Sequence, residues 1–102
     1  QLTNVLEKKF NKNDIIVAYE PIWSIGTGKI PTLNELKKTT IHIKKVLKGI
    51  FKKNSPAVLY GGSVDGSNVE MFSKIREIDG FLIGGASKTS KKFIDIIKNY
   101  YK

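Results

Sequence analysis

The sequence predicts an α/β fold in which helices cover a parallel sheet. Three short apolar strands are expected at residues 15–19, 57–60 and 81–83, and a helical pattern follows each of them. Strands without polar alternation are typical of parallel sheets that are covered on both faces. Regular alternation of strands and helices indicates the same class. Because crossovers between parallel strands are right-handed, two architectures remain, an open doubly wound sheet and a (β/α)₈ barrel.

The helices are placed by their apolar periodicity and by the residues at their ends. Residues up to about Phe10 carry the period of a helix tail. Thr32 and Glu35 form a capping-box pair before a long amphipathic helix that runs to about Lys53. Two later helices should bury apolar residues at helical spacing, namely Val69, Phe72 and Ile75 in one and Phe93, Ile96, Ile97 and Tyr100 in the other, with Tyr101 as a further candidate.

Composition and charge exclude several classes of protein. The chain has 102 residues and no cysteine, which indicates one ordinary domain without disulfides or a thiolate metal site. No apolar run approaches the ~20 residues that cross a bilayer, so no membrane partner is expected. The net charge of +9 is almost entirely lysine, and Arg76 is the only arginine. A solvated lysine surface is therefore favoured over a nucleic-acid partner, and a basic nucleic-acid-binding or interaction module is kept as the alternative.

The most informative segment is 18–29, which reads Ala-Tyr-Glu-Pro-Ile-Trp-Ser-Ile-Gly-Thr-Gly-Lys. Glu20 follows an apolar strand, Pro21 stiffens the next step of the chain, and Trp23 is a large anchor. A small glycine-bearing loop comes next, with Ile25 able to shield a ligand from water. A carboxylate at a strand end beside such a loop predicts a general base beneath a lid. The structural alternative is a carboxylate that caps a helix or joins an ion pair.

Paired glycines follow the second and third predicted strands, as Gly61 with Gly62 and as Gly84 with Gly85. Without Cβ atoms in the way, the backbone N–H groups of Ser63, Gly84 and Gly85 can converge on one anion. A helix N-terminus after Gly85 would add partial positive charge. The sequence therefore predicts a phosphate site at these strand ends, with a plain chain turn as the alternative. The loop at 23–31 fits neither a Walker A motif nor a dinucleotide fingerprint.

Segments 18–29, 60–64 and 80–87, taken together and in this order, resemble triosephosphate isomerase along the whole chain. The resemblance implies a TIM barrel, a (β/α)₈ barrel of which this chain covers roughly strands 6–8 and their helices. It implies that Glu20 moves a proton between adjacent carbons of dihydroxyacetone phosphate and D-glyceraldehyde 3-phosphate through an enediol(ate). The implied substrate-binding residues are Ile25, Gly26, Ser63, Gly84 and Gly85. The implied lid and its support are Pro21, Trp23, Thr27, Gly28, Lys29 and Tyr60.

The resemblance also implies an isomerase of glycolysis and gluconeogenesis, an intramolecular oxidoreductase that needs neither cofactor nor metal. We expect a homodimer in the cytoplasm, with an organelle such as a plastid as the alternative. The family's electrophilic His and substrate-binding Lys precede this segment, so His42 is expected to be a surface residue. We therefore expect residues 1–102 to be the C-terminal segment of a single barrel domain, inactive alone and partnered by the N-terminal part of the barrel. Another phosphate-binding barrel enzyme is the nearest alternative.

Two positions depart from the family pattern. Lys88 stands where a leucine is expected, and Ala57 stands where a basic residue is expected. Neither position lies on the expected chemical path, so both departures concern packing and ion pairing.

Overall fold

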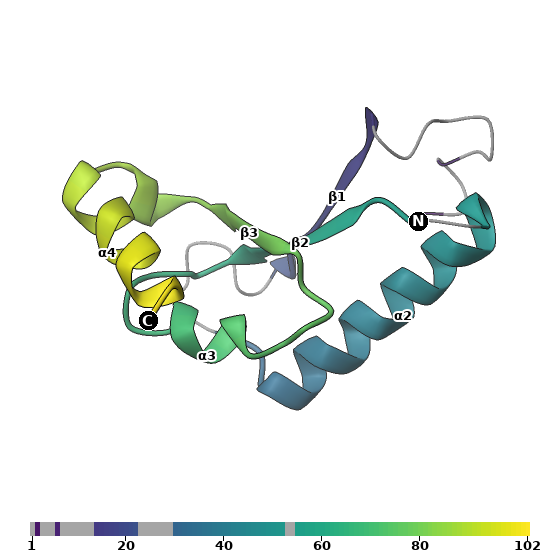
Figure 1. The fold of residues 1–102 in the computed structure, drawn as a ribbon, viewed down its shortest axis with the longest axis horizontal. Helices are drawn as coiled ribbons and strands as arrows, with labels where there is room; N and C mark the ends of the chain where they lie inside the picture. The colour runs from purple at the N-terminus through teal and green to yellow at the C-terminus, as the bar shows by residue number, and fades with distance from the viewer. Residues whose placement is uncertain (1, 3–5, 7–13, 23–29, 53–54) are drawn as a thin grey trace.

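A computed structural model describes residues 2, 6, 14–22, 30–52 and 55–102 (Figure 1). Strands and helices alternate as the sequence predicts. In chain order the elements are β1 (Ile16–Tyr19), α2 (Leu33–Phe51), β2 (Ala57–Gly62), α3 (Val69–Ser73), β3 (Gly80–Ile83), the 3₁₀ helix η3 (Gly85–Ser87) and α4 (Ser90–Tyr100). Most of the predicted helix tail before residue 11 lies outside the described residues.

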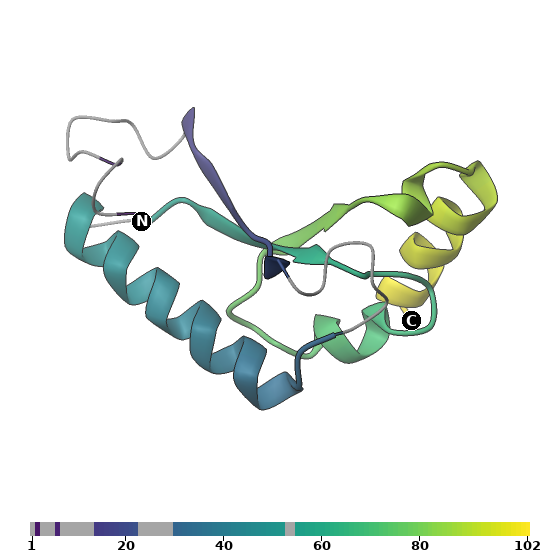
Figure 2. The same ribbon diagram turned by 180° about the vertical axis from the view of Figure 1, so that it is seen from behind.

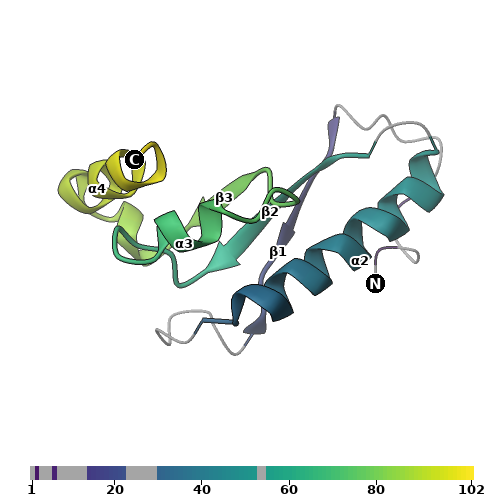
Figure 3. The same cartoon turned by 60° about the horizontal axis from the view of Figure 1, so that its bottom comes forward.

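The three strands form one parallel sheet in the order β1-β2-β3, which is also their order along the chain. Tyr19 pairs with Tyr60, and Tyr60 pairs with Phe81. Helices α2 and α3 lie on the same side of this sheet, as the opposite views in Figures 1 and 2 and the tilted view in Figure 3 agree. Sequential strands with helices on one face suit a barrel, because a doubly wound sheet has helices on both faces.

The main core lies between the sheet and its helices. Phe72 of α3 is fully buried, and its ring centroid lies 5.0 Å from that of Tyr60 on β2. The cluster of buried residues consists of Leu36, Tyr60, Val64, Val69, Phe72, Ile75 and Ile96. Burial of Val69, Phe72 and Ile75 is as the sequence predicts, although α3 ends at Ser73 and Ile75 follows the helix.

The other apolar face of the sheet is less covered than the sequence predicts. Ile16 on β1 is 68% exposed and Leu82 on β3 is 46% exposed, although both strands carry apolar residues on both faces. In α4 only Ile96 is buried; Phe93, Ile97, Tyr100 and Tyr101 are exposed, so their predicted burial is wrong for this structure. Periodicity identifies the apolar face of a helix but not what covers it, and α4 packs mainly against α3 and η3.

Helix α2 begins where the capping pair predicts. The Thr32 side chain accepts a hydrogen bond of 3.1 Å from the Glu35 backbone N–H, so it satisfies one of the amide groups that a helix start leaves without a partner. The helix ends at Phe51, close to the predicted end. Among the described residues, no helix combines the length and the apolar character that crossing a bilayer would require.

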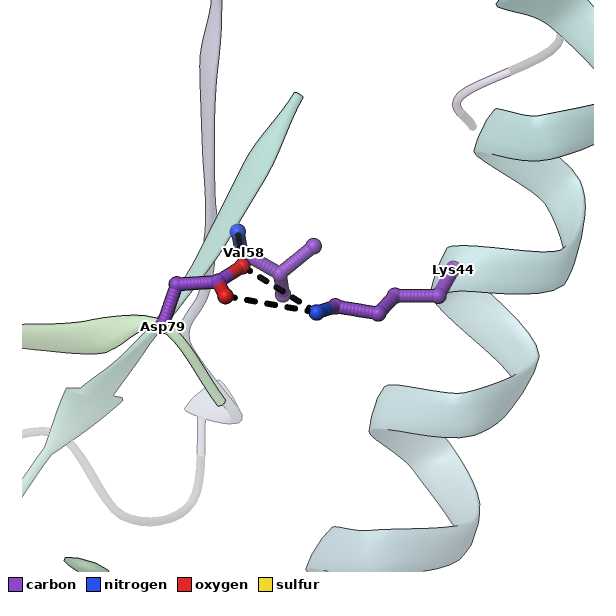
Figure 4. Close-up of polar contacts among 3 residues, drawn as sticks. All are labelled: Lys44, Val58 and Asp79. Carbon is purple, nitrogen blue, oxygen red and sulfur yellow. Dashed lines mark hydrogen bonds and ion pairs between the residues drawn. The ribbon is translucent and has the colours of Figure 1, made fainter. Parts of the chain in front are cut away.

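Asp79, just before β3, connects two neighbouring elements (Figure 4). Its Oδ2 accepts a hydrogen bond of 2.8 Å from the Val58 N–H, and its own N–H donates to the Val58 carbonyl at 2.8 Å. Lys44 of α2 places its Nζ 3.2 Å from Asp79 Oδ2. The Asp79 carboxylate therefore holds the amino ends of β2 and β3 together and ties α2 to them.

We expect the contacts of Asp79 with Val58 and with Lys44 to contribute unequally to the free energy of unfolding. Asp79→Ala should destabilise the folded protein by about 1–3 kcal/mol because the Val58 N–H loses its acceptor. Lys44→Ala should cost only about 0–1 kcal/mol because the ion pair is partly solvated. The comparison is made by urea denaturation of both variants. An equal loss of stability in the two variants would show that the ion pair, and not the hydrogen bond from the Val58 N–H to the Asp79 carboxylate, carries the stabilisation.

Candidate active site

The carboxyl ends of the three strands open into one cavity of about 970 Å³. Glu20 follows β1, Ser63 follows β2, and Gly84 and Gly85 follow β3; all four line this cavity. Parallel α/β folds place their sites at this end of the sheet, and small-molecule sites typically enclose ~300–1,000 Å³. The structure thus brings together four residues that the sequence predicts for chemistry.

Glu20 lies directly against the backbone of Gly61. A Cβ atom built on Gly61 would be 2.6 Å from Glu20 Cγ and 3.0 Å from Glu20 Oε1. The strand register explains this contact, because Tyr19 is level with Tyr60 and Glu20 is therefore level with Gly61. The first glycine after Tyr60 thus provides the space that the Glu20 side chain occupies at the cavity wall. The paired-glycine pattern predicted a site for an anion here but not this contact.

Gly84 and Gly85 face open space. A Cβ atom at either position would meet no neighbouring atom within 4 Å, so the packing of the described residues does not require glycine at these two positions. The Gly84 carbonyl accepts hydrogen bonds from the Ser87 N–H at 2.9 Å and from Ser87 Oγ at 2.6 Å. Because the peptide is planar and trans, this carbonyl sets the direction of the Gly85 N–H.

The helix expected directly after Gly85 is shorter than predicted. Residues Gly85–Ser87 form a single 3₁₀ turn, and the α-helix begins only at Ser90. Partial charge from the helix dipole is concentrated in the first turn of a helix. The α4 N-terminus is therefore displaced from Gly85, and its dipole is not placed at Gly85 as the sequence predicted.

The remaining predicted residues divide into two groups. Pro21 is buried directly after Glu20, and Tyr60 is 1% exposed in the core. The others lie outside the described residues, namely Trp23, Ile25, Gly26, Thr27, Gly28 and Lys29. The roles expected for both groups stay predictions.

Several residues that the sequence did not predict for the site also line the cavity. Leu82 and Ile83 supply apolar surface, and the charged lining adds Asp65, Lys88, Lys92 and Asp95 to Glu20. Lys88, which stands where a leucine is expected, therefore places a cation at the cavity. The sequence had suggested that this departure concerns packing and ion pairing only. In the part of the chain that the structure describes, no three His, Asp or Glu side chains are grouped to hold a metal ion.

Asn68 was also missed by the sequence analysis. Its Nδ2 donates a hydrogen bond of 2.7 Å to the carbonyl of Ser63, five residues earlier. The Asp-x-x-Asn spacing at 65–68, typical of side chains that hydrogen-bond nearby backbone in turns, is the signal that could have identified it.

Comparisons with known proteins agree on one family. A family model described as triosephosphate isomerase matches residues 1–100. The triosephosphate isomerase of Psychrobacter cryohalolentis is 47% identical over 83 residues, which cover 80% of this chain and 31% of that relative. The triosephosphate isomerase of Dictyostelium discoideum is 46% identical over 90 residues, which cover 83% of this chain and 34% of that relative.

A solved structure gives the same result. The crystal structure of triosephosphate isomerase from Bartonella henselae matches with a TM-score of 0.85 at 30% sequence identity, covering 99% of this chain and 41% of that one. This chain therefore spans about a third of the length of the two relatives above. Of the two architectures that the sequence left open, the match selects the (β/α)₈ barrel, of which the described sheet and helices are a segment. The chain belongs to the triosephosphate isomerase family.

Proposed function

We propose that the barrel containing this chain is a triosephosphate isomerase, which interconverts dihydroxyacetone phosphate and D-glyceraldehyde 3-phosphate in glycolysis and gluconeogenesis. The observation that carries the proposal is the shared cavity, where one carboxylate, Glu20, faces the same space as Ser63, Gly84 and Gly85. Membership of the triosephosphate isomerase family supports it. The reaction is an intramolecular oxidation and reduction, so the proposal requires no external oxidant or reductant.

Glu20 acts as the base in this proposal. Its carboxylate takes a proton from the carbon beside the carbonyl, and the C–H electron pair becomes the C=C bond of an enediolate whose negative charge lies on the former carbonyl oxygen. The charged oxygen next gains a proton while the hydroxyl on the neighbouring carbon loses one, a transfer that this proposal assigns to the rest of the barrel. Glu20 then returns its proton to the adjacent carbon, where the C=C electron pair becomes the new C–H bond and the deprotonated hydroxyl becomes the new carbonyl. Its position at the end of β1, beside the bare backbone of Gly61, supports this role, because proton transfer requires a base within hydrogen-bond reach of the substrate.

The substrate phosphate is held by backbone N–H groups of Ser63, Gly84 and Gly85. Uncharged backbone donors that are fixed before the substrate arrives stabilise an anion without reorganisation during the reaction. Residues 23–29 complete the site in this proposal: the Gly26 N–H joins the phosphate site and Ile25 seals it from water. Pro21, Trp23, Thr27, Gly28, Lys29 and Tyr60 form the lid and its support. The family resemblance supports these assignments.

In our proposal the rest of the barrel supplies the groups that this chain does not contain, namely the electrophilic His and the substrate-binding Lys. The exposed apolar residues Ile16 and Leu82 support it, because they lie on strands of a sheet that is closed in a complete barrel. Burying a large aliphatic side chain contributes roughly 1.5–3 kcal/mol. Residues 1–102 thus act as the C-terminal segment of one barrel domain, and catalysis requires the N-terminal part. The complete barrel forms a cytoplasmic homodimer in this proposal.

Glu20→Gln in the complete barrel tests the base directly. The amide keeps nearly the same shape but cannot accept the proton, so turnover should fall by ~10²–10⁴ or more. Inorganic phosphate should still bind. Turnover is measured in both directions and phosphate affinity by calorimetry, with Glu70→Gln on α3 as the matched control, since Glu70 does not line the cavity. Near-normal turnover of purified Glu20→Gln would exclude Glu20 as the base.

Gly85→Ala tests the phosphate site. Because a Cβ at this position meets nothing within 4 Å, the variant should fold with nearly unchanged stability. The added methyl group should obstruct the approach of phosphate to the backbone and weaken its binding by about tenfold or more, the effect of losing a hydrogen bond to a charged group. Gly49→Ala on α2, where a Cβ also meets open space, should leave phosphate affinity unchanged. Equal affinities in the two variants would place the phosphate elsewhere.

A further inference from the structure

Asn68 immediately precedes α3, at the position where asparagine side chains usually accept a hydrogen bond from the helix start. Its side chain makes no such bond. Its Nδ2 instead donates to the Ser63 carbonyl at 2.7 Å, and its Oδ1 accepts from the Asp65 N–H at 2.9 Å. The carboxamide therefore bridges the loop between β2 and α3.

Asp65 bonds the backbone of the residues that lead into α3. Its Oδ1 accepts hydrogen bonds from the Ser67 N–H at 2.8 Å and from the Asn68 N–H at 3.2 Å, and its carbonyl accepts from the Val69 N–H at 3.1 Å. Aspartate commonly bonds backbone groups two or three residues ahead in this way. The Ser67, Asn68 and Val69 N–H groups that lead into α3 thus have acceptors without the Asn68 side chain.

The peptide that joins Ser63 to Val64 is held at both ends. The Val64 N–H donates to the Gly62 carbonyl at 3.0 Å in a three-residue turn, and the Ser63 carbonyl accepts from Asn68 Nδ2. A planar trans peptide fixed at its N–H and at its C=O cannot rotate freely. The Gly62 carbonyl, held by the Val64 N–H, in turn sets the direction of the Ser63 N–H. Ser63 itself lines the cavity.

We propose that Asn68 is a positioning residue. By holding the Ser63 carbonyl, it keeps the loop in the conformation in which the Ser63 N–H binds the substrate phosphate. The proposal rests on the proposed function, because Ser63 is a phosphate-binding residue only there. Asn68 is not among the residues that line the cavity, so it acts through the Ser63 carbonyl and not by contact with substrate. Its loss lets the peptide turn and misdirects the Ser63 N–H.

The experiment compares Asn68→Ala with the unsubstituted enzyme in the complete barrel. The inhibition constant of inorganic phosphate and the KM for D-glyceraldehyde 3-phosphate should both rise about three- to tenfold, the effect of one hydrogen bond, while kcat changes little. Turnover of D-glyceraldehyde, which has no phosphate, should be unchanged. Asn68→Leu, similar in shape but without donor or acceptor, should behave in the same way and replaces Asn68→Ala if that variant does not fold.

Ser73→Ala is the matched control. Ser73 also donates from its side chain to a backbone carbonyl, that of Glu70 at 2.6 Å, but within α3 and away from Ser63. It should leave both phosphate constants unchanged.

Three results are decisive. An unchanged phosphate inhibition constant in Asn68→Ala would overturn the positioning role. A loss of turnover on D-glyceraldehyde equal to that on D-glyceraldehyde 3-phosphate would also overturn it, because Asn68 would then support the fold in general. If the unsubstituted enzyme does not isomerise triose phosphates, the proposed function is wrong. Phosphate titration of both proteins by calorimetry then decides the Asn68 proposal alone, and equal affinities would reject it.

Discussion

The parallel register of the three strands determines where Glu20, Ser63 and Gly84 lie relative to one another. The last pairs of the sheet are Tyr19 with Tyr60 and Gly62 with Ile83. One residue further along each strand, Glu20 comes level with Gly61, and Ser63 comes level with Gly84. A shift of one residue in either pairing would turn these groups to the opposite face. The Asp79 contacts with Val58, at the other end of the same strands, therefore help to define the geometry of the cavity.

In the proposed site backbone N–H groups bind the phosphate, so the side chains that hold the neighbouring peptides would control its geometry. Ser87 holds the Gly84 carbonyl through two hydrogen bonds, and Asn68 holds the Ser63 carbonyl through one. The Ser87 contacts fix the peptide plane that carries the Gly85 N–H. The Asn68 contact fixes the Ser63–Val64 plane, whose Val64 N–H holds the Gly62 carbonyl and so sets the direction of the Ser63 N–H. Catalytic sites depend on such preorganisation, because small errors in donor position reduce electrostatic stabilisation. The hydrogen bonds from Ser87 and Asn68 thus restrict a backbone whose glycines would otherwise be free to rotate.

The sequence predicted the strands and the residues at their ends well because these signals are local. Apolar runs before Glu20, Ser63 and Gly84 were sufficient to place all three at one edge of a parallel sheet. The exposure of Phe93 and Tyr100 could not be predicted in the same way, since an apolar helix face does not reveal what covers it. The Asn68 contact was missed for a different reason: asparagine before a helix predicts a cap, and only the structure shows that the carboxamide instead bonds the Ser63 carbonyl and the Asp65 N–H.

Titration of the complete barrel with inorganic phosphate, followed by the amide resonances of ¹⁵N-labelled protein, tests the central claim most directly. If the strand ends form one phosphate site, the amide signals of Ser63, Gly84 and Gly85 move together and report a single dissociation constant. The Gly49 signal on α2 should stay in place. Signals of the three strand-end amides that do not move, while phosphate shifts resonances elsewhere, would contradict the account.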